Sequence, residues 1–194
     1  MKATVKLILC QLVITILFIP TSINGQNYIK EVKGYSPHIG TTVAMLQDLK
    51  KRVTRSVENL SIEETDFLLD AEANRIGAMI LHLAATEKYY QVYTFEGRGL
   101  NSNERAEWDI AQNLGDEGRA TLKGKPIEYY LKIWDKVREE TLRLLKTKDD
   151  KWFKDNVKAE RSHMNNYWAW YHVMEHQANH MGQIRMIAKR ASKR

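Results

Sequence analysis

Apolar residues recur every three or four positions in four long segments of this chain, which is the spacing of amphipathic α-helices. The segments run from about 37 to 57, 74 to 95, 126 to 146 and 166 to 191. No convincing alternation of apolar and polar residues, the pattern of a strand, competes with them. Because each segment is long enough to present several turns to a core, the sequence predicts an all-α fold, a four-helix bundle.

The connection between the second and third predicted helices is unusually long. It covers residues 97 to 125, contains five glycines and has room for one short helix near residues 104 to 112. Such long connections are uncommon in compact domains unless they cross the fold or line a site. We therefore expect a crossover that joins two parallel neighbouring helices and forms part of the rim of a pocket.

The first 25 residues have the features of a secretory signal peptide. Two lysines give a positive start, residues 7 to 19 form an apolar run, and Gly25 is a small residue at the expected cut. The run is short for a membrane-spanning helix, which needs about 20 apolar residues, so an uncleaved anchor is the weaker alternative. We expect residues 1–25 to be removed and residues 26–194 to form one periplasmic or secreted domain, without stable membrane insertion after cleavage.

Composition excludes several kinds of site. The only cysteine is Cys10, inside the predicted signal peptide, so the mature chain has no disulfide, cysteine-bound zinc or cysteine nucleophile. The formal net charge of +6 becomes +4 when the two lysines of the signal peptide are removed. Much of this excess lies at the C-terminal end of the last helix, where positive charge complements the helix dipole. We therefore expect a small-molecule substrate and no nucleic acid as partner. The sequence does not decide whether the chain forms a homodimer.

Three histidines give the strongest chemical signal in the chain. His176 and His180 lie one turn apart on the apolar face of the fourth predicted helix, so their rings can approach one point. A third ligand must come from another helix, and His82 lies beside the apolar face of the second. Three imidazoles leave positions on a metal open for water or substrate, as catalytic sites require. We predict one divalent transition metal ion bound by these three histidines. Among zinc, nickel, copper and iron, which all accept nitrogen ligands, we favour zinc or nickel.

Two other metal patterns fit the sequence less well. His172 to His176, with Glu175 between them, matches the inverted motif of some zinc proteases, but no acidic residue follows to complete that site. A ferritin-like centre needs two Glu-x-x-His pairs, and only Glu160 and His163 have that spacing. A pair of core histidines without any metal is the remaining alternative. The roles of His172, Glu175 and a glutamate on the second helix, Glu87, stay open.

With these residues, the chain resembles the DinB/YfiT-like family of metal-binding four-helix bundles. The resemblance rests on the pattern His176-x-x-x-His180-x-Gly182-Gln183 and on the run from His82-Leu83 to Glu87 and Tyr89-Tyr90. It implies a bundle with a long crossover between helices two and three, and one metal held by the three histidines at one end of the bundle. Characterised relatives are similar to thiol-dependent transferases and isomerases, in which the metal activates a low-molecular-weight thiol.

The resemblance and the histidines together lead us to expect an exported metal-dependent enzyme. Its open coordination position would activate water or a thiol toward a small substrate, as in a hydrolase or a thiol transferase. Trp108, Tyr89, Tyr90, Trp168 and Trp170 are candidates for lining the pocket, although ordinary packing explains most of them better. The alternative is a non-catalytic periplasmic metal-binding or scaffold bundle. A fourth protein ligand would favour this alternative, and an open position would favour catalysis.

Overall fold

The structure, a computed structural model, describes residues 28–160 and 162–193, and its regular elements are all helices. The four long ones are α1 (Pro37–Val57), α3 (Ile76–Gln91), α6 (Ile127–Leu145) and α8 (Asn166–Ala191). The shorter ones are α2 (Ile62–Thr65), the π-helical segment η1 (Val92–Glu96), α4 (Ser102–Asn113), α5 (Gly115–Thr121) and α7 (Asp150–Lys154). The predicted all-α class is therefore confirmed. The second predicted helix begins at Ile76 rather than at residue 74, and its last part is π-helical.

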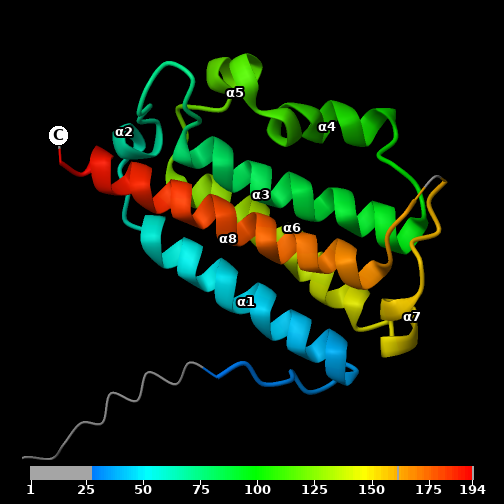
Figure 1. Cartoon of the computed structure of the whole chain (residues 1–194). Helices are drawn as coiled ribbons and strands as arrows, with labels where there is room; N and C mark the ends of the chain where they lie inside the picture. The colour runs from blue at the N-terminus through cyan, green and yellow to red at the C-terminus, as the bar shows by residue number, and fades with distance from the viewer. Residues whose placement is uncertain (1–27, 161, 194) are drawn as a thin grey trace, which may run out of the picture.

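The long helices pack side by side along their apolar faces. Helix α3 contacts both α6 and α8, and α1 packs mainly on α8. Figure 1 shows α3 and α6 running in one direction and α1 and α8 in the opposite direction. In α1 the buried apolar side chains are Ile39, Val43, Leu46, Leu49, Val53 and Val57. Their spacing of three or four residues puts them on one face, so this helix forms because it can bury that face against the others.

A fully buried ion pair joins three of the long helices. Glu87 of α3 has no exposed surface, and both of its oxygens accept hydrogen bonds from the Arg138 guanidinium of α6, at 2.7 and 2.9 Å. The same carboxylate accepts hydrogen bonds from Trp134 and Thr141 of α6 and from Gln177 of α8. Burial by itself raises the pKa of the Glu87 carboxyl, but the charge of Arg138 and these hydrogen bonds outweigh it, so the net pKa is lowered. Glu87 therefore holds helices together.

The connection between α3 and α6 contains two helices where the sequence predicted one. Helix α4 packs along α3, and α5 follows it directly (Figure 1). Asn101 and Glu104 form a capping box at the start of α4, which fixes where that helix begins. Leu114 has a positive φ of 56°, so the chain turns sharply there and the two helices do not merge. This connection covers the side of α3 that bears His82.

The predicted signal peptide, residues 1–25, lies outside the described residues. Within residues 28–160 and 162–193, no helix combines the length and the apolar character that crossing a membrane would need.

Candidate metal centre

The structure brings together the three histidines that the sequence singled out. His82 comes from α3, and His176 and His180 come from α8. One nitrogen from each ring lies within 4.8 Å of the other two, and the ring centroids are 4.6 to 4.9 Å apart. All three side chains are half-buried. The cluster lies near the middle of α8, which continues to Ala191, and not at the end of the long helices that the family resemblance implies.

Two of the rings are oriented by hydrogen-bond acceptors that contact the ring nitrogen directed away from the cluster. His82 Nδ1 lies 2.9 Å from the carbonyl oxygen of Ala111, and His180 Nδ1 lies 2.8 Å from Oε1 of Gln183. Because a carbonyl oxygen only accepts hydrogen bonds, each Nδ1 bears the proton and each Nε2 keeps its lone pair. Metal-binding histidines are commonly held in this way, with one ring nitrogen bound to protein and the other free for the ion.

The free nitrogens converge. His82 Nε2 lies 2.8 Å from His176 Nε2, which is also 3.4 Å from the Thr86 hydroxyl. Lone pairs directed at one another repel unless a proton or a cation lies between them. Three imidazole nitrogens at this separation, two of them on rings whose outer nitrogen is already hydrogen-bonded, therefore fit a divalent transition metal ion.

The surroundings lower the pKa of all three imidazoles. Burial lowers the pKa of His82, although the backbone of Ala111 and Gln112 opposes this effect. Burial also lowers the pKa of His180, together with the charge of His82. The pKa of His176 falls to about 3, because of burial first and then the neighbouring histidines. The lowered pKa values favour the neutral form of each ring, which is the form that binds a metal.

The acceptor for His82 was not foreseen from the sequence. Ala111 lies in the last turn of α4, where helix carbonyls lack partners within the helix. Such a carbonyl leaves no mark in a sequence, because every residue has one. Gln183 belongs to the pattern that suggested the family, and its spacing of three from His180 was the only signal of its contact.

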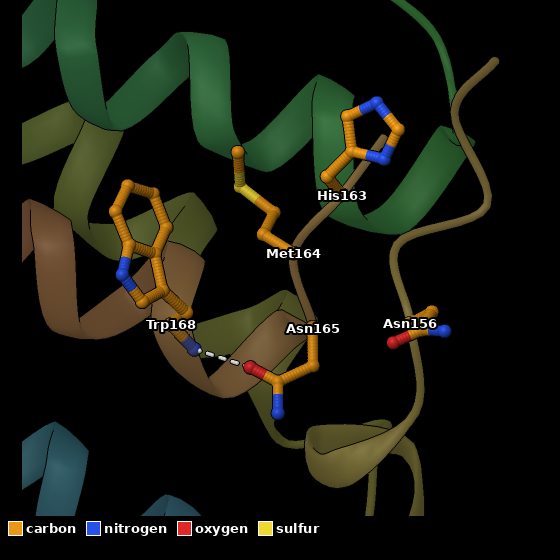
Figure 2. Close-up of a pocket in the computed structure, with 5 residues that line it drawn as sticks. All are labelled: Asn156, His163, Met164, Asn165 and Trp168. Carbon is orange, nitrogen blue, oxygen red and sulfur yellow. Dashed lines mark hydrogen bonds between the residues drawn. The ribbon is translucent and has the colours of Figure 1, made fainter. Parts of the chain in front are cut away.

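The other candidate residues lie outside the group of three. His172 Nδ1 is 3.3 Å from a Glu175 oxygen, and its ring centroid is 5.8 Å from that of His176. Glu175 is exposed and points to His172 rather than into the cluster, which removes the support for a zinc-protease motif. His163 is exposed and lines a separate cavity (Figure 2). Trp108, Tyr90 and Trp170 are buried in the core, whereas Tyr89 is half-buried and Trp168 is exposed.

Comparison with known proteins agrees with the resemblance. Residues 41–191 match the family model described as mycothiol-S-transferase, which spans α1 to α8 and includes all three histidines. No curated protein matches the chain. Since the match covers most of the sequence, this chain belongs to the mycothiol-S-transferase family, which is DinB/YfiT-like.

Proposed function

We propose that this protein is a metal-dependent thiol transferase whose three histidines, His82, His176 and His180, bind one divalent ion, zinc or nickel. The observation that supports this most strongly is the convergence of three neutral imidazoles from two helices, two of them oriented by outer hydrogen bonds. An ion bound there would lower the pKa of a thiol that occupied its open position. The family description supports a low-molecular-weight thiol of the mycothiol kind as one substrate.

The reaction we propose is transfer of the thiol sulfur to a small electrophile. The thiol loses its proton to solvent, its sulfur forms a bond to an electrophilic carbon, and the group displaced from that carbon leaves with the bonding electrons. The residues of the chain contribute by holding and exposing the site. The three rings are half-buried, so a small molecule can reach them, and the Thr86 hydroxyl beside His176 can hydrogen-bond to a bound polar group.

The number of ligands favours catalysis over a structural ion. Among the described residues, the group that could hold a metal consists of three histidines and no carboxylate. Three protein ligands leave a tetrahedral ion one position for substrate or water, whereas structural zinc sites are closed by four. The ion would also keep its full positive charge, because imidazole is neutral.

Three further proposals complete this interpretation. The four long helices form the four-helix bundle of the family, with α4 and α5 as the crossover, and the parallel course of α3 and α6 in Figure 1 supports this. Residues 26–194 form that domain. Residues 1–25 direct export to the periplasm or beyond, which rests on the sequence pattern alone.

The first test is metal content. We would purify the chain from residue 26 without an affinity tag, soak it with zinc or nickel, and compare it with a His176→Ala/His180→Ala variant. We expect about one equivalent of metal in the wild type and none in the variant, with helical circular dichroism unchanged. His38→Ala is the control, because His38 is exposed and belongs to α1.

The second test is activity. Thiol transfer to a small electrophile should occur in the metal-loaded wild type and in His38→Ala, and be lost in the double variant. If the wild-type protein bound neither zinc nor nickel, the proposed metal site would be wrong. Metal binding with hydrolysis but no thiol transfer would identify a hydrolase, and metal binding without either activity would favour the non-catalytic alternative.

A further inference from the structure

A continuous series of rings leads away from the histidine cluster along α8. Trp168, His172 and His176 recur every fourth residue, so they lie on one face of the helix. The indole of Trp168 stacks on the His172 ring with centroids 5.1 Å apart and planes 5° apart, and His172 lies 5.8 Å from His176. Since a helix rises 1.5 Å per residue, Trp168 is about 12 Å from His176 along the axis.

One aromatic residue of α3, Tyr90, contacts this series and is itself in contact with Tyr89. The Tyr90 ring lies 5.8 Å from His172, and Tyr89 stacks on Tyr93 with centroids 5.4 Å apart and planes 16° apart. Tyr89 and Tyr93 are half-buried, so part of each ring remains accessible. Aromatic rings of α3 and η1 are therefore linked to the α8 series through the contact between Tyr90 and His172.

The series ends at a cavity. Trp168 is 45% exposed, whereas Trp134 and Trp170 are fully buried in the core. Its side chain lines a cavity of about 450 Å³ together with Asn156, His163, Met164 and Asn165. Figure 2 shows the indole and the Met164 side chain on the same side of the loop, while the Asn165 side chain points the other way and caps the helix through the Trp168 backbone.

Backbone contacts hold the cavity in shape. Asn156 and Asn165 form an isolated antiparallel bridge, and the Val157 backbone donates a hydrogen bond to the Met164 carbonyl at 3.0 Å. These contacts tie the two sides of the loop together. None of the five described residues that line the cavity is an acid, a lysine or an arginine. A flat apolar ligand in this cavity could extend the stack of Trp168 and His172.

We propose that Trp168 forms a binding subsite for a neutral, planar aryl group of the electrophilic substrate, whose reactive carbon lies at the histidine cluster about 12 Å away. This inference rests on the proposed function, because it assigns the reacting end of the substrate to the metal site. It makes Trp168 a determinant of specificity and not a catalytic residue. The substrates it selects are arenes whose electrophilic carbon is on a side chain long enough to reach the histidine cluster from Trp168.

The binding test uses two unreactive probes that share a ketone and differ in flatness, acetophenone and cyclohexyl methyl ketone. Binding to the chain from residue 26 would be measured by ligand-observed NMR titration after removal of metal with a chelator. We expect acetophenone to bind the wild type more tightly than the cyclohexyl probe, and about tenfold more weakly to Trp168→Ala. Trp168→Phe should bind at an intermediate level, because it keeps a flat ring.

Two controls separate this subsite from other surfaces. Tyr171→Ala removes an aromatic residue of α8 that is 49% exposed and does not line the cavity, and it should bind acetophenone like the wild type. His176→Ala should also bind normally, because the subsite does not need the metal. Equal binding by Trp168→Ala and the wild type, or equal binding of the two probes, would overturn the inference.

The kinetic test distinguishes failure of the subsite from failure of the proposed function. In the metal-loaded enzyme, Trp168→Ala should raise KM for an aryl electrophile about tenfold and leave KM for a small alkyl electrophile unchanged. A raised KM for the thiol instead would overturn the assignment of this subsite. Should the enzyme transfer no thiol at all, the proposed function fails, while acetophenone binding still reports on the subsite itself.

Discussion

The substitution Arg138→Met removes the positive charge from the buried pair that joins α3, α6 and α8. Glu87 would keep its full burial but lose the two hydrogen bonds of 2.7 and 2.9 Å that the guanidinium donates. Arg138 also donates to the Leu46 carbonyl of α1 at 2.6 Å, so a fourth long helix loses a contact. Methionine fills a similar volume, which keeps the cavity contribution small.

The expected cost follows from the uncompensated carboxylate. Removing one partner of a buried ion pair destabilises a protein by about 3–5 kcal/mol, because the remaining charge stays out of water without its counter-ion. For a domain of this size, each kcal/mol lowers the melting temperature by roughly 2–4 °C. We therefore expect the midpoint of thermal unfolding, followed by circular dichroism, to fall by roughly 6–20 °C.

The matched control lies on the same helix. Arg143 pairs with Glu140 through two hydrogen bonds of 2.7 Å, but 64% of its side chain is exposed. Arg143→Met should therefore lower the midpoint of thermal unfolding far less than Arg138→Met does. Glu87→Leu combined with Arg138→Met should be less damaging than Arg138→Met alone, because it removes the unpaired charge. The reasoning is refuted if Arg138→Met costs as little as Arg143→Met, or if the double variant is the least stable.

Three further predictions concern the metal centre and the packing around it. Gln183→Leu removes the acceptor of His180 Nδ1 and should weaken zinc or nickel binding about tenfold to a hundredfold, measured against a chromogenic chelator. Gly77→Ala should lower the free energy of unfolding by about 1–3 kcal/mol in chemical denaturation, since the new Cβ meets the buried Tyr130 ring. The Cβ added by Gly182→Ala meets open space, so this change should stabilise α8 by about 0.5–1 kcal/mol. The folded-state pKa of His176 is about 3 and lies below the usual 6.5, so between these pH values the unfolded chain binds more protons. The metal-free protein should therefore lose stability as the pH falls through that window, and His176→Ala should lose less, as denaturation midpoints at several pH values would show.

The sequence by itself determined the helices and most of their limits. The repeats of three and four residues in α1 and α8 predict helices at 37 to 57 and 166 to 191, and the structure has helices over those same ranges. This works because burial of one apolar face is a local property of the sequence that period and composition reveal. The prediction was less accurate after α3, where five residues adopt a π-helix, and in the connection between α3 and α6, where an unpredicted second helix, α5, follows Leu114.

The candidate site could also be predicted from the sequence. A spacing of four places His176 and His180 on one face of the fourth predicted helix, and His82 was the one histidine on the second. What the tertiary structure alone decided was how these rings are held. The carbonyl of Ala111 orients His82 across 29 residues of chain, and such a backbone contact has no residue preference that a sequence could display.

The tertiary structure likewise decided the role of Glu87. Its position five residues after His82 left a place in the site open, yet Arg138, 51 residues away, holds its carboxylate in the core. A buried charge requires a partner of opposite sign, and which partner lies within reach depends on how α3 and α6 pack and not on their separate sequences.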